Sequence, residues 1–522
     1  MSKTHKTNLP AVLIILDGWG VRAEGQGNAI KQAITPNMDR LWQSNPHSLL
    51  AASGKAVGLP AKQAGNSEAG HLNIGAGRIV DQDSVKITES INNGTFYKNP
   101  AFIRAVRHVM KHKSRLHLLG MLSGDQSPHM DPKHILALIE LCRQRQLDEV
   151  VLHLFTDGRD SPPHFTIKFM KKLAKILDPH REKVATIAGR LYMDRKKKWT
   201  RTEKIYDYLT RADAGFNRAA SPAEAILSAY KRGETDEFIS PTIIYQGGKP
   251  TPRISDNDSI IFFNLRSDRA RQLSKPFVQS DFNKKNHNAF RRKKILKNIV
   301  FVAMTDFGPD LGDILTAYPS EDITGTLPMA LKNYRQLYIA ESDKFAHVTY
   351  FLNGGYNHPV AGEQRLLVES PDVKKYDQTP EMSAGLITDT VTSALKAQRF
   401  DFITLNYANP DMVGHTGNYK ATVQAITYLD KCIGRIEKVI VKKKGLLTIC
   451  ADHGNADQMM EDGNKELITQ HSDSPIPFII AARSVRRKRM KAKGVLGNIA
   501  PTMLEAIGVP VPKEMTGGSL WL

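Results

Sequence analysis

A set of aspartates and histidines in this sequence has the side chains that most often bind divalent metal ions. Asp17 follows the apolar run Ala11–Leu16, and Asp452 follows a second apolar run, Leu446–Cys450. Carboxylate and imidazole ligands suit Mn²⁺, Zn²⁺ or Mg²⁺, and two such ions side by side clamp a phosphoryl group. The full set is Asp17, Asp411, His415, Asp452, His453 and His471.

The spacing within this set favours a shared site. Asp411 and His415 are four residues apart, so one helical turn would place both side chains on the same face. His471 precedes a third apolar run, Pro477–Ala482. Taken singly, each histidine is more often a hydrogen-bonded structural residue than a ligand. Taken together, three aspartates and three histidines near strand ends or glycine-rich turns predict a metal centre.

Ser67 is the candidate nucleophile. It lies within Gly65–His71, where flanking glycines let the backbone turn sharply and leave a hydroxyl exposed. A serine hydroxyl needs a base or a metal ion to lower its pKa before it can attack. The sequence lacks the Gly-x-Ser-x-Gly elbow of esterases, so a metal-bound alkoxide fits better than a catalytic triad.

Arginines in the middle third of the chain form a second candidate site. They lie in or near Asp157–Asp160, Gly189–Arg195 and Asn264–Arg269, close to the ends of predicted strands. One Arg–Asp pair is more often structural, but several arginines at strand ends favour a doubly anionic ligand held in bidentate fashion. No Walker-type phosphate loop accompanies them. The arginines are Arg159, Arg190, Arg195, Arg266 and Arg269.

The elements that must position these residues follow an α/β pattern, in which short apolar runs alternate with amphipathic stretches. Because ligands collect at the carboxyl ends of strands in such sheets, the chemistry should lie there. Predicted strands are Ala11–Leu16, Arg115–Met121, Glu149–Phe155, Val184–Ile187, Ser259–Leu265, Ile299–Met304, Phe402–Asn406, Leu446–Cys450 and Pro477–Ala482. Predicted helices are Pro100–His112, Asp131–Arg145, Pro162–Leu177, Thr200–Thr210, Ser221–Arg232, Ser383–Ala397 and Tyr419–Val441.

The composition is that of a soluble globular protein with more than one domain. The chain has 522 residues, of which 41% are hydrophobic and 24% charged, and chains above roughly 250–300 residues usually divide. No apolar run approaches the roughly 20 residues of a membrane helix, and the polar stretch Met1–Pro10 is unlike a secretory signal. Three cysteines without CxxC spacing argue against a disulfide framework and favour the reducing cytoplasm.

The formal net charge of +20 is the unusual bulk property. It suits nucleic acid, an anionic membrane surface or anionic substrates. Lysines and arginines concentrate in Lys284–Lys294 and Arg483–Lys493, with few aromatic residues between them and no nucleic-acid-binding motif. We interpret both stretches as solvated surface. A nucleic-acid-binding protein remains the alternative from a different class, and a salt-sensitive gel shift would support it.

These motifs together resemble those of the cofactor-independent phosphoglycerate mutases, in the alkaline-phosphatase-like superfamily. The resemblance spans nearly the whole chain, from the Asp17 motif to residues 514–517. Its most specific parts are Gly65–His71, Asp157–Pro163, Phe262–Gln272, Ala340–His347, Asn409–Gly417 and Ala451–Asp457.

The resemblance implies an α/β fold with two domains. An alkaline-phosphatase-like metal domain would comprise residues 1–81 and 314–522. An α/β transferase domain that binds substrate would be inserted between them, over residues 82–313. Domain closure that excludes water is then expected, because water would turn a mutase into a phosphatase.

The resemblance also implies roles for individual residues. Ser67 would become phosphorylated, with Asp160 and His129 suited to proton transfer. One metal site would comprise Asp17, Ser67, Asp452 and His453, and the other Asp411, His415 and His471. The substrate-binding positions would be His129, Arg159, Asp160, Arg190, Arg195, Arg266, Arg269 and Lys344.

The implied reaction interconverts 3-phosphoglycerate and 2-phosphoglycerate through a phosphoserine. It would use two divalent ions, with Mn²⁺ first and Mg²⁺, Co²⁺ or Zn²⁺ as alternatives, and no 2,3-bisphosphoglycerate. We expect a cytoplasmic monomer with a small-molecule substrate and neither a nucleic-acid nor a membrane partner.

The sequence departs from the family pattern at two places, and three other enzyme classes are alternatives to a phosphoglycerate mutase. The loop Ser123–His129 has one residue more than usual, and Arg190 and Arg195 stand five apart rather than six. The rivals are a metal-dependent phosphatase, a phosphopentomutase and a sulfatase. A sulfatase would need a C/S-x-P-x-R motif that Gly65–His71 lacks, and a phosphopentomutase is not expected to carry both arginine motifs.

Overall fold

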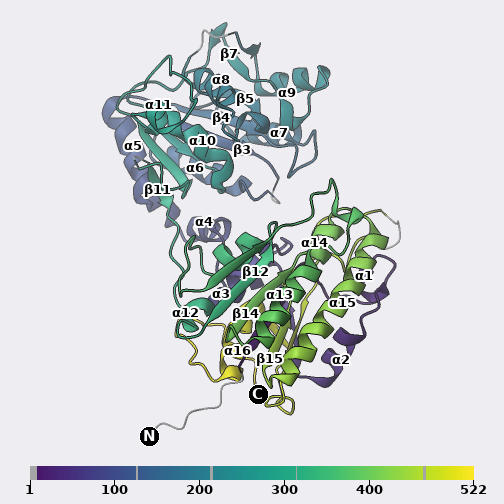
Figure 1. The fold of residues 1–522 in the computed structure, drawn as a ribbon. Coiled ribbons are helices and arrows are strands. Elements are labelled where there is room, and N and C mark those ends of the chain that lie inside the picture. The colour runs from purple at the N-terminus through teal and green to yellow at the C-terminus, as the bar shows by residue number, and fades with distance from the viewer. Residues whose placement is uncertain (1–8, 125–126, 212–214, 313, 462–465) are drawn as a thin grey trace. The chain divides into compact units, whose positions relative to one another are not determined.

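The computed structural model describes residues 9–124, 127–211, 215–312, 314–461 and 466–522. The chain forms two compact units, each built around its own sheet (Figure 1). Unit 1 joins residues 1–82 to residues 321–522, and unit 2 is the continuous segment 83–320. The first unit is therefore discontinuous in sequence.

The sheet of unit 1 has eight strands, five of them parallel neighbours on one side. All six residues of its central strand β1 are buried, so helices must cover both faces. In spatial order the strands are β13 (Gln364–Val368), β12 (Gln336–Glu341), β14 (Phe402–Tyr407), β1 (Ala11–Leu16), β15 (Leu446–Cys450), β16 (Ile476–Ala481), β2 (His47–Ala51) and β17 (Lys493–Val495).

The helices of unit 1 form two packed groups. The long helix α15 packs on α13, α1 and α2, and these helices lie together over one side of the unit in Figure 1. A second group joins α3 to α12 and α16. The helices are α1 (Ala29–Gln32), α2 (Pro36–Ser44), α3 (Ser67–Ala76), α12 (Leu327–Ala330), α13 (Ala384–Lys396), α14 (Asn409–Gly414), α15 (Tyr419–Lys442) and α16 (Ile499–Ile507).

Unit 2 has a mostly parallel sheet of its own, with a separate apolar core. Its strands are β11 (Leu315–Tyr318), β10 (Val300–Thr305), β9 (Ser259–Phe262), β3 (Leu116–Leu122), β4 (Val150–Thr156), β5 (Glu182–Gly189), β7 (Thr242–Gln246) and β6 (Asn217–Ala219), with β8 (Lys249–Pro250) paired to β7. Its helices are α4 (Asp83–Asn92), α5 (Pro100–His112), α6 (Pro132–Gln144), α7 (Thr166–Ile176), α8 (Trp199–Thr210), α9 (Pro222–Lys231), α10 (Ser267–Val278) and α11 (Phe282–Lys285).

The predicted α/β class with a discontinuous unit is confirmed, and every predicted strand and helix is present within a few residues of its expected limits. The strand expected over Ser259–Leu265 ends earlier, at Phe262. The second boundary between the units lies at Ser320 rather than at residue 313, because β11 pairs with β10 and so belongs to unit 2. Asp313 itself lies outside the described residues.

The elements that were not predicted include strands β2, β12 and β13 and helices α3 and α10. Helix α3 is rich in glycine and alanine and is buried nearly all round, so it lacks the amphipathic pattern that reveals a surface helix. No helix among the described residues is long and apolar enough to span a membrane.

Candidate metal centre and anion site

Three neighbouring parallel strands carry the three aspartates of the predicted metal set. Asp17 directly follows β1, Asp411 lies on the short helix after β14, and Asp452 follows β15. Because β1 lies between β14 and β15, all three carboxyl groups meet at one edge of the sheet. Gly18 has a φ of +76°, and an added Cβ would lie 2.9 Å from the backbone of Asp411, so only glycine allows this approach.

Ser67 is the first residue of helix α3 and is buried, whereas we predicted a sharp turn between flanking glycines with an exposed hydroxyl. The Asn66 side chain caps the helix by accepting a hydrogen bond from the Ala69 N–H at 2.9 Å. The Ser67 hydroxyl lies 3.1 Å from Asp17 Oδ1 and 2.9 Å from His453 Nε2. The serine is nearly fully buried, and its hydroxyl points into the carboxyl cluster.

The three predicted histidine ligands are oriented by the same kind of hydrogen bond. Each directs its Nδ1 at a backbone carbonyl: His415 at Thr469, His471 at Gly65, and His453 at Gly454. This leaves each Nε2 facing the carboxyl groups. In metal-binding histidines, a hydrogen bond from the other ring nitrogen orients the ring in the same way.

The structure brings the two halves of the metal set together. Nε2 of His415 and of His471 lie 3.1 and 3.2 Å from Asp411 Oδ1, as the four-residue spacing of Asp411 and His415 predicted. His453 Nε2 lies 3.4 Å from Asp17 Oδ1 and 3.6 Å from Asp452 Oδ2.

Among the described residues, three groups of side chains have ligand atoms within 4.8 Å of one another. One is the predicted set around Asp411. The other two share Asp17, and one of them includes a residue that we did not single out, His71. The groups are Asp411 with His415 and His471, Asp17 with Asp411 and His453, and Asp17 with His71 and Asp452.

Lys344 lies within this cluster rather than among the arginines. Its Nζ is 2.7 Å from Asp17 Oδ1, 2.7 Å from Asp411 Oδ2 and 2.8 Å from Ser67 Oγ. The unpredicted strand β12 positions it, because β12 pairs with β14 and Lys344 follows three residues after β12 ends. Strand β12 was hard to predict from the sequence, because its apolar residues are few and polar residues stand at both of its ends.

Electrostatics in this cluster oppose the effect of burial. Burial would raise the pKa of Asp17, but Lys344 and then His453 hold it well below its usual range. Burial likewise opposes the charge on Lys344, yet Asp17 and Asp411 raise its pKa above the ordinary value. Burial also disfavours protonated His453, but Asp452 and Asp17 raise its pKa to about 9. The site therefore attracts cations strongly.

The donor set fits divalent metal ions. Asp452 Oδ2 is buried and accepts no hydrogen bond from any described residue, so a ligand atom is available. The pKa of His453 is raised because a proton on its ring balances the negative charge of Asp452 and Asp17. A bound metal ion would balance that charge instead. Oxygen and imidazole donors of this kind suit Mn²⁺, Mg²⁺, Co²⁺ or Zn²⁺.

The arginine set of unit 2 converges at the ends of β4 and β5. Arg190 follows β5 and is buried, with its Nη1 2.5 Å from both Asp157 Oδ1 and Asp160 Oδ2. Its Nη2 lies 3.0 Å from His129 Nε2. Burial and the neighbouring Arg190 lower the pKa of His129 to about 4, although Asp268 opposes the shift. His129 is thus neutral and accepts a hydrogen bond from Arg190.

Helix α10 brings further charged groups to this cluster. Arg195 pairs with Asp268 at 2.6 Å, and Arg269 donates to the Met193 carbonyl at 3.1 Å. Burial, followed by Arg190 and Arg195, lowers the pKa of Arg269, so its neighbours are mainly cationic. Such a cluster is stabilised by a bound anion.

The same cluster contains buried polar atoms without hydrogen-bond partners. His129 Nδ1, Arg190 Nε, Asp268 Oδ1 and Arg269 Nε are buried without a hydrogen-bond partner among the described residues. Arg159 and Arg266 are exposed, and Arg266 precedes the first residue of α10. Of the atypical loop Ser123–His129, Asp125 and Gln126 lie outside the described residues.

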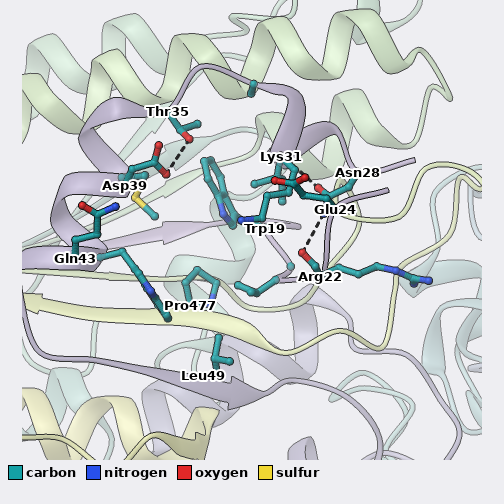
Figure 2. A pocket seen from close by; sticks show the side chains of 16 residues that line it. Trp19, Arg22, Glu24, Asn28, Lys31, Thr35, Asp39, Gln43, Leu49 and Pro477 are labelled. Atoms are coloured by element: carbon teal, nitrogen blue, oxygen red, sulfur yellow. Dashed lines mark hydrogen bonds between the residues drawn. The ribbon is translucent and has the colours of Figure 1, made fainter. Parts of the chain in front are cut away.

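A separate pocket lies beside the segment that carries Asp17. Figure 2 shows Trp19 projecting into this cavity of 460 Å³, whose apolar wall includes Trp42, Leu49 and Pro477. None of its described lining residues is a predicted metal ligand. We assign it no part in the chemistry of the carboxyl cluster.

The fold and the carboxylate–histidine centre define a metalloenzyme. A family model described as the Metalloenzyme superfamily matches residues 9–511, which include every predicted site residue. Use of divalent metal by this chain follows from that membership and from the donor groups above.

Curated relatives narrow the class further, and the chain belongs with them to the 2,3-bisphosphoglycerate-independent phosphoglycerate mutases, which are isomerases. A protein of that name from Methanosarcina acetivorans is 47% identical over 516 residues, covering 98% of each chain. One from Clostridium tetani is 43% identical with the same coverage. The crystal structure of Leishmania mexicana phosphoglycerate mutase at low cobalt concentration is 28% identical, with a TM-score of 0.76 over 100% of this chain and 99% of that one.

Proposed function

We propose that this enzyme interconverts 3-phosphoglycerate and 2-phosphoglycerate through a phosphoserine at Ser67, with two divalent ions and without 2,3-bisphosphoglycerate. The observation that carries the proposal is the position of the Ser67 hydroxyl, within 3.1 Å of Asp17, His453 and Lys344. A serine in these surroundings is placed to form and release a phosphate ester. The names of the relatives supply the substrate class.

The metal ligands divide into two sets in this proposal. Bound ions would lower the pKa of the serine hydroxyl and offset the charge of the phosphoryl group. Lys344, next to Ser67, adds a fixed positive charge for the same phosphate. The sets are Asp17, Ser67, Asp452 and His453 for one ion, and Asp411, His415 and His471 for the other.

The arginine cluster of unit 2 would hold the glycerate part of the substrate while the hydroxyl groups exchange places. Support comes from its unsatisfied buried donors and from the cationic surroundings of Arg269. Asp160 and the neutral His129, both in contact with Arg190, are suited to proton transfer at those hydroxyl groups. Metal chemistry is thus proposed for unit 1 and most of the substrate binding for unit 2, with Lys344 as the binding residue that belongs to unit 1. The proposed binding set is His129, Arg159, Asp160, Arg190, Arg195, Arg266, Arg269 and Lys344.

We further propose Mn²⁺ as the working ion, and a monomer in the cytoplasm. The carboxylate and imidazole donors are compatible with Mn²⁺, as they are with Mg²⁺, Co²⁺ or Zn²⁺. Three buried free cysteines are compatible with a reducing compartment.

A coupled assay tests the proposed reaction. Purified enzyme loaded with Mn²⁺ should convert 3-phosphoglycerate to 2-phosphoglycerate when 2,3-bisphosphoglycerate has been removed enzymatically. Strict dependence on added bisphosphoglycerate would contradict the proposal, and so would the release of inorganic phosphate as the main product.

Arg266→Ala should impair substrate handling without emptying the metal sites. Loss of a charge-assisted contact to phosphate or carboxylate costs about 2–4 kcal/mol, which is roughly 30- to 1,000-fold in kcat/KM. Metal content and any slow hydrolysis of a small aryl phosphate should stay near wild type, because the proposed ligands all belong to unit 1. Metal analysis and both assays on the same preparation measure this.

Arg271→Ala is the matched control, since Arg271 lies on the same helix but pairs with Asp310 at 2.8 Å on the surface. Its kcat/KM should stay near wild type. Loss of bound metal in folded Arg266→Ala protein would show that the division of labour between the two units is wrong.

Glutamine substitutions in the basic stretch Arg483–Lys493 should leave turnover within about twofold of wild type, as expected for exposed side chains. The stretch follows β16, which runs antiparallel to β15, so it begins at the sheet edge opposite the carboxyl cluster. Arg486, Arg487 and Arg489 are exposed. Steady-state assays at moderate salt measure the effect, and a large fall in turnover would reveal a functional element there.

A further inference from the structure

We propose that His71 and Asn406 are positioning residues that hold the carboxyl groups of Asp17 and Asp452 in place for metal binding. The inference rests on the proposed metal chemistry of these two aspartates. Neither His71 nor Asn406 belongs to the predicted ligand sets. Both are fully buried, and together they connect Asp17 to Asp452.

Asn406 provides the first link of this connection. It lies on β14, paired with Ile15 of β1, so its side chain emerges beside the strand that leads to Asp17. Its Nδ2 donates to Asp17 Oδ2 at 2.8 Å and lies 3.1 Å from His71 Nε2. A carboxylate only accepts hydrogen bonds, so the amide nitrogen, not the oxygen, must face Asp17.

This orientation determines the tautomer of His71. The second N–H of the Asn406 amide points at His71 Nε2, which must then be the unprotonated acceptor. The proton of the neutral ring is therefore on Nδ1. That nitrogen lies 2.9 Å from the Ser67 carbonyl oxygen and 3.2 Å from Asp452 Oδ2.

Helix α3 explains why His71 reaches both groups. His71 is four residues after Ser67, so its ring lies over the turn that carries the nucleophile. Gly70 allows the helix to approach Asp452, because an added Cβ there would lie 2.7 Å from Asp452 Cβ. The same helix thus places the Ser67 hydroxyl 3.1 Å from Asp17 Oδ1 and His71 Nδ1 3.2 Å from Asp452 Oδ2.

The alternative that His71 itself binds a metal ion fits its contacts less well. The three predicted histidine ligands direct Nδ1 at a carbonyl and leave Nε2 facing the cluster. In His71 the Nε2 is occupied by an amide donor, and Nδ1 is directed at the Ser67 carbonyl. A similar contact occurs at the other aspartate, where Asn455 Nδ2 donates to Asp411 Oδ1 at 3.0 Å. Buried amides thus orient two of the three carboxyl groups.

The effect on metal binding follows from this geometry. Partners that orient ligands typically contribute 10- to 100-fold in metal affinity or activity. His71→Leu and Asn406→Leu should each weaken Mn²⁺ binding by roughly that factor. His71→Asn should recover much of the loss, because its amide nitrogen can occupy the place of Nδ1, between the Ser67 carbonyl oxygen and the Asp452 carboxyl group, whereas His71→Gln should not.

The experiment is a Mn²⁺ titration of metal-free, folded protein, followed by calorimetry or by the electron paramagnetic resonance signal of free Mn²⁺. His117→Leu is the matched control, since His117 is a fully buried histidine 3.0 Å from Asp258 in unit 2. It should lower the thermal unfolding temperature without changing Mn²⁺ affinity. The turnover of the His71 and Asn406 variants should be closer to that of wild type at saturating Mn²⁺ than at limiting Mn²⁺.

The possible outcomes separate this inference from the proposed function. Unchanged Mn²⁺ affinity in folded His71→Leu and Asn406→Leu proteins would overturn the inference and leave the proposed reaction intact. Loss of one of two bound ions in His71→Leu, without recovery in His71→Asn, would make His71 a ligand and overturn the positioning role. Failure of the wild type to bind Mn²⁺ would instead count against the proposed function. If the leucine variants do not fold, equal affinities of His71→Asn and His71→Gln would still contradict the inference.

Discussion

Ser67→Ala protein should fold, bind metal ions more weakly than wild type and show no mutase turnover. The hydroxyl is the group placed to carry the phosphoryl group, and no other described hydroxyl contacts both Asp17 and Lys344. The free energy of unfolding should change by only about 1 kcal/mol, the usual contribution of one hydrogen-bonded hydroxyl. Thermal unfolding, metal titration and the coupled assay measure the three effects.

Mass spectrometry of substrate-treated wild type provides the direct evidence, as an added phosphate on the peptide that contains Ser67. Ser90→Ala is a suitable control, because Ser90 is a buried helical serine in unit 2 whose hydroxyl donates to the Ile87 carbonyl. It should keep full turnover. Mutase activity in Ser67→Ala protein would rule out the covalent route proposed here.

Removal of divalent metal should abolish turnover, and Mn²⁺ should restore it. Asp17, Asp411 and Asp452 are buried together around Ser67, and Lys344 alone cannot replace the ions that these donors fit. Because carboxylates and neutral imidazoles are the binding forms, the apparent affinity for Mn²⁺ should rise as the pH is increased. The assay compares chelator-treated enzyme before and after addition of Mn²⁺, Mg²⁺, Co²⁺ or Zn²⁺.

Two controls make this measurement specific. The coupling enzymes must be shown to work under the same chelator conditions, and elemental analysis must confirm that the treated protein has lost its metal. Full turnover in protein shown to be metal-free would refute the two-metal proposal. Restoration by Mg²⁺ but not by Mn²⁺ would leave the reaction standing and correct only the choice of ion.

Much of the fold could be predicted because the strands are continuous apolar runs. Ala11–Leu16 and Leu446–Cys450 have the limits observed for β1 and β15, since strands buried on both faces exclude polar residues until the chain leaves the sheet. The aspartate that follows each run is therefore recognisable at a strand end. The Asp411–His415 contact was predictable for a similar reason, since it depends only on helical spacing.

The surroundings of Lys344 and His71 could not be predicted in this way. Lys344 reaches Asp17 only because β12 pairs with β14, which in turn pairs with β1, and pairing between distant strands leaves no local pattern. Helix α3 is buried nearly all round, so His71 looked like part of a glycine-rich turn. His71 also depends on Asn406, which is 335 residues away in sequence.

The amino-acid sequence by itself determined which chemical groups this enzyme carries and at which strand ends they lie. Local periodicity and the chemistry of single side chains are sufficient for that, because both act over a few residues. Only the tertiary structure decided which groups meet. The order of strands around β1 brings together Asp17, Asp411 and Asp452 from segments hundreds of residues apart, and burial then sets their charges. The tautomer of His71 and the raised pKa of His453 exist only once these neighbours are in place.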